Sequence, residues 1–339
     1  MKVLQGNWQN SSIKKELGKY LPEEIPNSPQ RKFASLVVIR EFESTAVLTT
    51  EGQVLDVELV RAGHNHPEAI SRVLLQKRKQ VAPERRTGRA LNRERRALNR
   101  EQDRGEECKY MEQMCGKCPD CLIYGYAATS GEGAQRSRVL TDSGFTIRPY
   151  EGMQRSITLN AINDTTKGGV WGSAFAEIEH IRPQVFFPTI ETVTDVTPAE
   201  FLYVLRNILM TTRYGAESNR QGYVKNHVVA ILFGEGELLS NLALTQGVYD
   251  LLYEQQGEKL HEFPLERSAV ERAVLQVIER EVEQAYFPIH LYQGEAVQEM
   301  LASAREVWRS EEGKEAWLKE LEEVQKKYLL EQPKKKKKK

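Results

Sequence analysis

The alternation of hydrophobic and polar residues predicts β-strands near the start of the chain. Residues 34–42 (ASLVVIREF) and 53–60 (QVLDVELV) are rich in β-branched side chains, so we expect them to form a pair of strands joined by a turn. Residues 67–75 begin with Pro67 and Glu68, and proline is favoured at the first position of a helix. We therefore expect a short helix after the strand pair.

A helix with clear start signals is predicted from residue 198 onward. Thr197 is a favoured N-cap residue, Pro198 suits the first helical position, and Glu200 completes a capping box with Thr197. Apolar residues then recur at helical spacing, at Phe201, Val204, Leu205, Ile208 and Leu209. The pattern predicts an amphipathic helix with one face in the core.

The rest of the chain continues this mixture of helices and strands. A glycine-containing loop leads into residues 226–233 (NHVVAILF), which are short and β-branched enough to form a buried strand. Helical periodicity predicts further helices over 265–286 and 295–330. The order of elements predicts an α+β fold, compatible with a split β-α-β, ferredoxin-like core that carries large insertions.

A long β-hairpin is predicted over residues 159–181 (LNAINDTTKGGVWGSAFAEIEHI). Its tip, near Asp164 to Gly172, is rich in Gly, Thr and Asp, which is typical of an exposed turn. Trp171 and Phe175 either form an apolar wedge on this hairpin or pack against its own base.

Four cysteines lie within fourteen residues, at Cys108, Cys115, Cys118 and Cys121, with the spacing C-x6-C-x2-C-x2-C. Four thiolates can complete a tetrahedral zinc shell, so we expect structural zinc rather than a catalytic ion. Iron–sulfur ligation, four reduced thiols without metal, and disulfides are the alternatives. An H-x-H pair, His64 and His66, either replaces one cysteine ligand or forms the entry turn of the helix expected at 67–75.

The formal net charge is zero, but the last six residues are all lysine, so the other 333 residues carry a net charge of −6. Residues 76–106 are locally basic and contain the unit RALNRE twice. This segment is either a solvated, partly helical insertion or an arm for a polyanion. The chain contains no apolar run long enough for a membrane helix, and its N-terminus lacks the continuous apolar stretch of a secretory signal. We therefore expect a cytoplasmic protein with reduced thiols.

Motifs of common enzymes are absent from the sequence. It contains no G-x-x-x-x-G-K-[ST] phosphate loop, no G-x-G-x-x-G after a strand and no G-x-S-x-G elbow. Asp142 and Asp164 are either phosphodiester-cleaving acids or ordinary turn residues. We therefore expect no catalytic residues.

Residues suited to binding phosphates and bases are more abundant. Lys and Arg neutralise phosphate charge, glycines admit close backbone approach, and aromatic side chains stack on bases. The candidate RNA-binding residues are Arg40, Arg136, Arg138, Arg155, Lys167, Trp171, Arg213, Tyr214, Gly215, Arg220, Gly222, Lys225 and Asn226.

Three motifs together resemble a known family. CPDCLIYGYAATSGEGAQRSRVLTDSGF is similar to the C-x-x-C-x-L-[FY]-G … S-R-V-x-x-x-D pattern of the RAMP superfamily of CRISPR effector subunits. The matching residues are Cys118, Cys121, Tyr124, Gly125, Ser137, Arg138, Val139 and, loosely, Asp142. The hairpin segment resembles the thumb of the backbone subunits, and residues 197–226 resemble the backbone subunit of type I-D systems. The chain thus resembles the I-D variant of the "Cas seven" family of Cascade backbone subunits.

The resemblance implies an RRM-like core with inserted zinc-binding, thumb hairpin and helical subdomains. It implies that copies assemble into a helical filament along one CRISPR RNA, beside other Cascade subunits and a target DNA or RNA strand, for antiviral defence. Such a subunit grips the sugar–phosphate backbone without reading bases and is not an enzyme. Related type III subunits cleave target RNA with a thumb-loop aspartate, and Asp164 lies in the corresponding loop. A target-strand nuclease and a zinc-stabilised protein-interaction module are the alternatives.

We expect five regions along the chain. They are an RRM-like core at 1–75 with 180–262, a basic insertion and zinc-binding region at 76–125, a strand-rich region with the thumb hairpin at 126–180, a helical region at 263–333, and a disordered lysine tail at 334–339.

Overall fold

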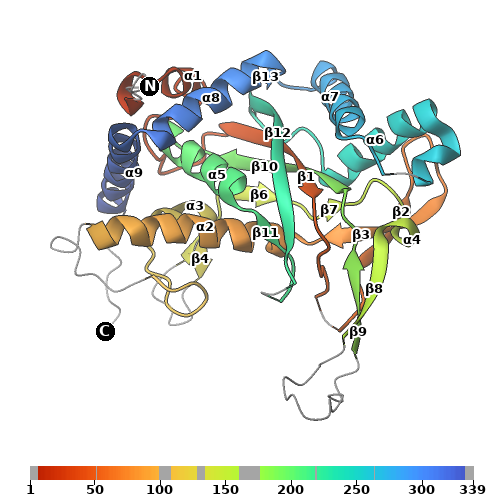
Figure 1. Ribbon diagram of the computed structural model, residues 1–339. Helices are drawn as coiled ribbons and strands as arrows, with labels where there is room; N and C mark the ends of the chain where they lie inside the picture. The colour runs from red at the N-terminus through yellow and green to blue at the C-terminus, as the bar shows by residue number, and fades with distance from the viewer. Residues whose placement is uncertain are drawn as a thin grey trace, which may run out of the picture.

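The fold combines helices with antiparallel sheets, which confirms the expected α+β class (Figure 1). It was obtained as a computed structural model. The structure describes residues 7–50, 52–98, 108–127, 134–159, 176–217, 220–262 and 264–332.

The central sheet has the strand order β11-β12-β1-β10-β6, with every neighbouring pair antiparallel, and β13 pairs with the other end of β12. Its strands are β1 (Phe33–Phe42), β6 (Val139–Thr141), β10 (Val185–Thr194), β11 (Arg213–Tyr214), β12 (Gly222–Gly234) and β13 (His290–Gln293). The long strand β1 lies in the middle, and its buried residues alternate between two hydrophobic clusters on opposite faces of the sheet.

Helices cover both faces of the central sheet. On one face, Leu36 and Val38 of β1 pack in a core that also takes residues from α1, α2, α3, α5, α8 and α9, and on the other face Val37 and Ile39 share a core with α6 and α7. The helices are η1 (Trp8–Asn10), α1 (Ser12–Leu17), α2 (Lys77–Leu98), α3 (Pro119–Tyr124), α4 (Tyr150–Met153), α5 (Pro198–Met210), α6 (Asn241–Gln256), η2 (Gly257–His261), α7 (Arg267–Glu283), α8 (Glu295–Arg309) and α9 (Glu311–Glu331). None of the helices in the described ranges is long and apolar enough to cross a membrane.

Helix α5 forms where its end signals predict it. The hydroxyl of Thr197 accepts a hydrogen bond from the Glu200 backbone N–H, and the Glu200 carboxylate accepts one from the Thr197 N–H at 3.1 Å. Its apolar stripe is buried, except for the half-buried Leu209. The helix expected over 295–330 is also present, but it divides at Ser310, whose side chain caps α9.

Smaller sheets surround the central one. They are β2 (Val57–Arg61) with β3 (Ala69–Leu75) and β7 (Gly144–Phe145), β4 (Tyr126–Ala127) with β5 (Ala134–Gln135), and β8 (Gln154–Leu159) with β9 (Ala176–Ile181). The β8–β9 pair lies at the base of the predicted hairpin, but its first strand begins at Gln154, before the predicted start at residue 159. Asp164, Lys167, Trp171 and Phe175 lie outside the described residues.

Two local expectations were wrong. Residues 69–75 form strand β3 rather than a helix, because Val73 and Ile70 pair with β2 and pack in two different cores. The strands at 34–42 and 53–60 do not pair with each other, since β1 lies between β10 and β12 while β2 pairs with β3. Helix α6 was not anticipated.

Candidate metal centre and nucleic-acid interface

The four cysteines meet at the start of α3. Their sulfur atoms all lie within 4.8 Å of one another, and the Sγ atoms of Cys108 and Cys121 are 3.5 Å apart. Four thiolates at about 2.3 Å from one zinc ion would be separated by about 3.8 Å. The cluster is therefore compatible with a metal site, and the 3.5 Å separation is too long for a disulfide bond.

The backbone around the cluster donates hydrogen bonds to sulfur. The N–H of Cys115 points to the Cys108 sulfur at 3.3 Å, and the N–H groups of Lys117 and Cys118 point to the Cys115 sulfur at 3.4 and 3.3 Å. Gly116 has a φ of +67°, and a Cβ there would lie 2.6 Å from the Tyr126 hydroxyl. This tight turn gives the donor set that a tetrahedral thiolate site needs.

Neither histidine of the H-x-H pair lies at this cluster. The Nδ1 atom of His66 is 2.8 Å from a carboxylate oxygen of Asp250, and the Nε2 atom of His64 is 3.0 Å from the Ala243 carbonyl. The metal-binding group found in the described ranges contains the four cysteines alone. Replacement of a cysteine ligand by either histidine is therefore not supported.

The basic segment at 76–106 is not a solvated insertion where it is described. Its first part forms α2, whose inner face carries the buried residues Gln80, Glu84 and Leu91. A Cβ on Gly88 would come within 2.3 Å of the Tyr203 hydroxyl, so the tip of this α5 side chain packs directly against α2. Residues 99–106 lie outside the described ranges.

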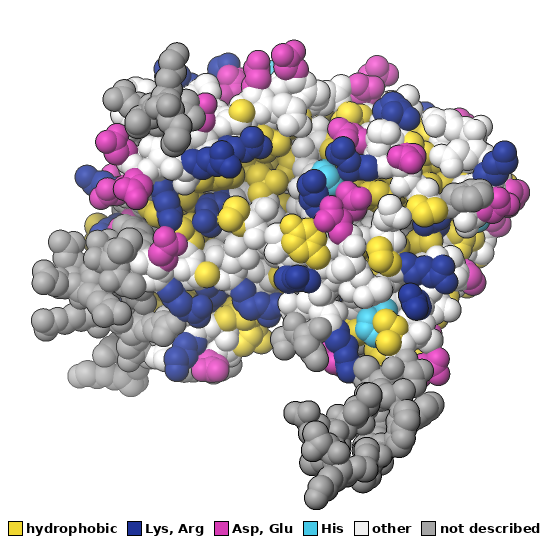
Figure 2. All heavy atoms as spheres, in the orientation of Figure 1, with side chains coloured by type: hydrophobic (Ala, Val, Ile, Leu, Met, Phe, Trp, Pro, Cys, Tyr) yellow, Lys and Arg dark blue, Asp and Glu magenta, His cyan; other side chains and the backbone are white. Residues whose placement is uncertain are grey.

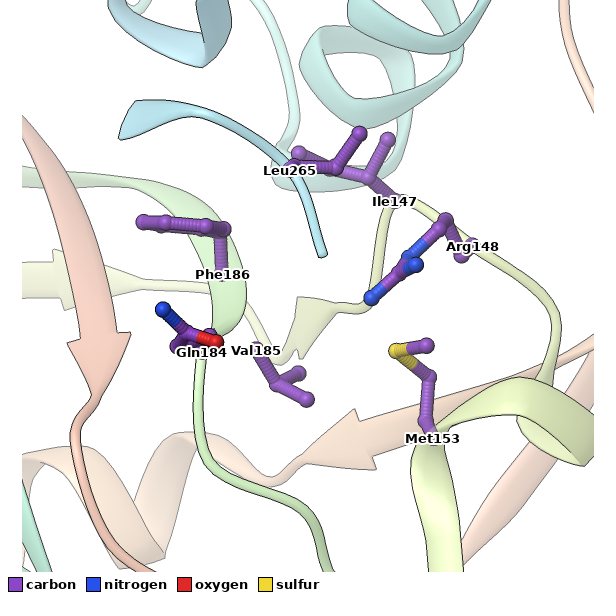
Figure 3. Close-up of a pocket in the computed structure, with 7 residues that line it drawn as sticks. All are labelled: Ile147, Arg148, Met153, Gln184, Val185, Phe186 and Leu265. Atoms are coloured by element: carbon purple, nitrogen blue, oxygen red, sulfur yellow. The ribbon is translucent and has the colours of Figure 1, made fainter. Parts of the chain in front are cut away.

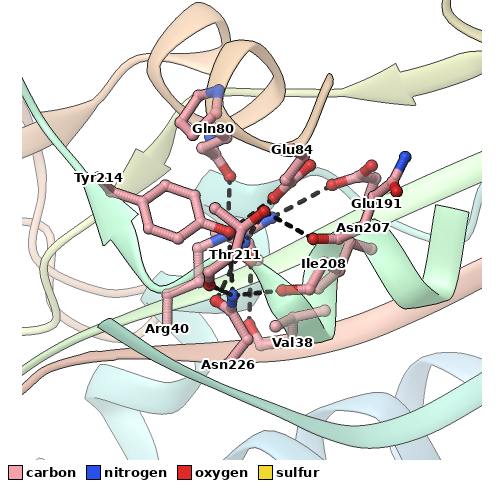
Figure 4. Close-up of polar contacts among 12 residues, drawn as sticks. Val38, Arg40, Gln80, Glu84, Glu191, Asn207, Ile208, Thr211, Tyr214 and Asn226 are labelled. Atoms are coloured by element: carbon pink, nitrogen blue, oxygen red, sulfur yellow. Dashed lines mark hydrogen bonds and ion pairs between the residues drawn. The ribbon is translucent and has the colours of Figure 1, made fainter. Parts of the chain in front are cut away.

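Arg40, a candidate for RNA binding, is fully buried in a polar network between the central sheet and α2 (Figure 4). Its guanidinium forms ion pairs with Glu84 at 2.8 Å and Glu191 at 3.2 Å. It also donates hydrogen bonds to the Tyr214 hydroxyl at 3.0 Å and the Asn226 side-chain oxygen at 3.1 Å. Three candidate residues thus meet in one place, but inside the protein and facing each other.

The two carboxyl groups of this network cannot both be charged without repelling each other. Burial raises the pKa of Glu191 well above its usual value, and the nearby Glu84 carboxylate raises it further. Burial therefore favours the protonated, neutral form of Glu191, which leaves Arg40 to pair with Glu84. The network is balanced in charge and has a structural role.

Arg138 has a similar internal role. Its guanidinium contacts the carboxylate of Glu200, which is completely buried, with one N–O distance of 2.8 Å. It also donates a hydrogen bond to the Asp195 carbonyl at 2.9 Å. Arg138 directly precedes β6, so these contacts hold the capped start of α5 next to that strand.

A different group of side chains faces solvent on β11 and β12. Arg213 lies directly opposite Tyr223 in the strand pairing, and Lys225 follows two residues later on the same face. The Arg213 guanidinium lies over the Tyr223 ring, 5.4 Å from its centre. All three side chains are exposed, Tyr223 by 38%. We call Arg213, Tyr223 and Lys225 the strand patch.

The neighbouring glycines have a packing role. A Cβ on Gly215 would lie 2.8 Å from the Val47 carbonyl oxygen, and one on Gly222 would lie 2.6 Å from the Ala46 Cβ. These glycines let two protein segments approach each other, so the space beside them is already filled. Arg220 is half-buried and forms an ion pair with Glu217 at 2.6 Å.

The other described candidates lie elsewhere. Arg136 is exposed and follows β5, on the two-stranded β4–β5 sheet, whereas Arg155 is exposed on the hairpin strand β8. Arg136 and Arg155 therefore lie in different parts of the fold. Asp142 is exposed, and its backbone carbonyl accepts hydrogen bonds from Gln80 and Asn241.

The basic segment at 76–106 carries a second basic surface on α2, whose individual residues were not among the sequence candidates. Lys79, Arg86 and Arg93 of α2 are seven residues apart, which places them on one helix face, opposite the inner face. Lys79 is half-buried and the other two are exposed. We call these three residues the helix stripe. The seven-residue spacing of Lys79, Arg86 and Arg93 was the sequence signal that could have revealed this stripe.

The helix stripe lies next to the strand patch. Helix α2 contacts β11, and the hydroxyls of Thr87 and Thr211 are 2.7 Å apart. Figure 2 shows Lys and Arg side chains along α2 and across the middle of the same face. Together they form a surface suited to a polyanion.

Two pockets share Arg148 in their lining. One of them is also lined by Pro149, Glu151, Gly152 and His261. The other, shown in Figure 3, is too tight to admit a water molecule and is lined by Ile147, Arg148, Met153, Gln184, Val185, Phe186 and Leu265. These residues include no carboxylate and no nucleophile activated by a base.

Comparison with known families assigns the chain. The family model described as Csc2 Crispr matches residues 20–318. The chain belongs to the Csc2 CRISPR family. This confirms the CRISPR assignment that the cysteine, hairpin and helix motifs predicted. No curated protein sequence matches the chain.

A solved structure has a similar fold. The crystal structure of Thermofilum pendens Csc2 aligns with a TM-score of 0.57 and 20% identity, over 95% of this chain and 98% of that one. This Csc2 structure supports the fold. Chains of a CRISPR RNA-guided surveillance complex, and of such a complex before nicking, align with TM-scores of 0.47 and 0.49 at 9% identity. Each alignment covers 77% of this chain, with 88% and 92% of the other chain.

Proposed function

We propose that this Csc2-family protein is a non-catalytic RNA-binding backbone subunit of a type I-D CRISPR surveillance complex. The observation that carries the proposal is the exposed basic surface of the strand patch and helix stripe, on a chain of a CRISPR family. Copies of the subunit would line one CRISPR RNA in the cytoplasm, beside other Cascade subunits and the target strand.

The basic surface suits a single strand of any sequence. Arg213 and Lys225 offer positive charge to phosphates, and Tyr223 offers a ring on which a base can stack. Neither kind of contact depends on base identity. One protein can therefore hold every guide.

The fold supports a more detailed version of the proposal. The strand order β12-β1-β10-β6 is that of a split β-α-β core, so we propose an RRM-like core carrying the β8–β9 thumb and the cysteine region as insertions. We propose zinc as the ion of the cysteine cluster, in a structural role. The five sequence regions remain our proposed domain division.

A binding measurement with labelled single-stranded RNA tests the function. We expect similar affinity for several unrelated sequences, falling steeply with salt. Neutralising Arg86, Arg213 and Lys225 to Gln should reduce the slope of log affinity against log salt by about 2, since each lost phosphate contact removes roughly 0.7 from it.

The matched control neutralises Lys319, Lys326 and Lys327 on α9, which are exposed and change the net charge equally. We expect this variant to bind RNA nearly as well as the wild type. Equal losses in both variants would contradict the proposed surface. Regularly spaced cleavage of a target strand with Mg²⁺, lost in Asp164→Ala, would instead favour a nuclease.

A further inference from the structure

Helix α2 is fastened to the cysteine region by two of its arginines. Arg85 donates two hydrogen bonds to the buried carboxylate of Asp120, at 2.9 and 2.8 Å, and Arg89 donates one to the same carboxylate at 2.5 Å. Asp120 lies between two of the cysteines, in the first turn of α3. One carboxylate thus holds two adjacent turns of α2.

Arg89 also reaches the other end of the cluster. Its guanidinium donates a hydrogen bond to the Cys108 carbonyl at 2.9 Å and another to the Cys108 sulfur at 3.3 Å. Both guanidinium groups lie over the Tyr110 ring, at 4.9 Å for Arg85 and 5.2 Å for Arg89. The contacts of α2 therefore span the cysteine segment from Cys108 to α3.

The charges favour this arrangement when the cluster holds a divalent ion. Four thiolates around such an ion leave a net charge of about −2, to which Asp120 adds another negative charge. Arg85 and Arg89 place two positive charges against it. Hydrogen-bond donors around a metal site orient its ligands and stabilise it, so Arg89 has the position of an outer-shell partner.

We propose that Arg89 and Asp120 form a clamp through which the metal-loaded cysteine cluster fixes the position of α2. The same helix carries Lys79, Arg86 and Arg93 on its outer face. Loading of the cluster then determines how the helix stripe is presented. The consequence for RNA rests on the proposed function, whereas the clamp itself does not.

The first test measures metal affinity in the full chain with Zn²⁺ and, as a coloured probe, Co²⁺. Because Arg89 donates to a ligand sulfur, Arg89→Gln should weaken binding by roughly 10-fold or more. Arg89→Lys keeps the charge but not the forked donors, and should recover part of the loss. The control is Arg78→Gln, an exposed residue of α2 away from the cysteines.

The second test measures hydrogen exchange of backbone amides. Residues 77–94 of α2 should exchange at least tenfold faster in the metal-free protein and in metal-loaded Arg89→Gln, while α7 keeps its protection. If metal removal unfolds the whole chain, α7 will also exchange faster. In that case the comparison of metal-loaded Arg89→Gln with metal-loaded Arg78→Gln tests whether Arg89 stabilises α2.

Equal metal affinity of Arg89→Gln and Arg78→Gln, with α2 exchange unchanged, would overturn the clamp. RNA affinity separates this from the proposed function. A wild-type protein that binds RNA, together with an unaltered α2, would refute only the clamp. Faster α2 exchange without any change in RNA affinity would keep the clamp and refute the role of the helix stripe in RNA binding.

Discussion

Arg40 and Arg213 are the same residue type, yet they occupy opposite environments. Arg40 is fully buried and contacts the carboxyl groups of Glu84 and Glu191, whereas Arg213 is exposed and lies over the Tyr223 ring. Burial with complete pairing makes an arginine part of the framework, since its charge is already neutralised. An exposed arginine without a carboxylate partner can offer its charge to phosphate.

The two regions are also connected. Tyr214 hydrogen-bonds Glu84 inside the protein at 3.0 Å, while the preceding residue, Arg213, faces solvent. Asn226 hydrogen-bonds the end of α5, while Lys225 faces solvent beside it. Because side chains alternate along a strand, the internal network fixes the backbone that presents the strand patch.

The largest expected effect on stability comes from removing the buried arginine, Arg40. Arg40→Ala leaves a buried carboxylate without its counter-ion and should lower the free energy of unfolding by about 3–5 kcal/mol. Arg213→Ala, at an exposed position, should change it by less than about 0.5 kcal/mol. Urea denaturation of both variants checks this. Comparable losses would mean that the two arginines do not differ as described.

A smaller effect concerns the pH dependence of stability. The pKa of Glu191 is raised in the folded protein, so between its ordinary and its folded pKa the folded state binds more protons than the unfolded state. Stability from this group is therefore complete at low pH and is lost as pH rises, by up to about 1.4 kcal/mol per pH unit.

Glu191→Gln keeps a neutral side chain and removes this dependence. The unfolding free energy of the variant minus that of the wild type should rise between pH 5 and 7, when both are measured in the same denaturant series. Parallel curves for the two proteins would show that Glu191 is ionised in the fold.

A third effect, on RNA binding rather than on stability, concerns the exposed Tyr223. Tyr223→Ala removes a stacking surface and should weaken RNA binding by about 1–3 kcal/mol, with little change in stability. Tyr223→Phe keeps the ring and should bind nearly as well as the wild type. Fluorescence anisotropy with one RNA at fixed salt compares the three proteins, and equal weakening in both variants would argue against stacking.

Features set by neighbouring residues were predictable from the sequence. The cysteine cluster lies within fourteen residues, and the cap of α5 lies within four, so local spacing was enough to place them. The start of β3 misled the prediction, because Pro67 and Glu68 are typical of a helix start while pairing with β2 comes from a separate segment.

The roles of individual arginines could not be predicted in this way. The partners of Arg40 lie 44 and 151 residues away in the chain, and Arg138 pairs with a carboxylate 62 residues away. Only the fold shows which arginines have found an internal partner. Sequence reasoning alone therefore lists candidate cations without separating buried, paired residues from those on the surface.

The most direct test of the central claim is ultraviolet crosslinking of the bound RNA, followed by mass spectrometry of the crosslinked peptides. The account predicts crosslinks at Tyr223 and in peptides of β11, β12 and α2, with none in α7 or α9. Crosslinks confined to other surfaces, with Tyr223 and α2 unmodified, would contradict it.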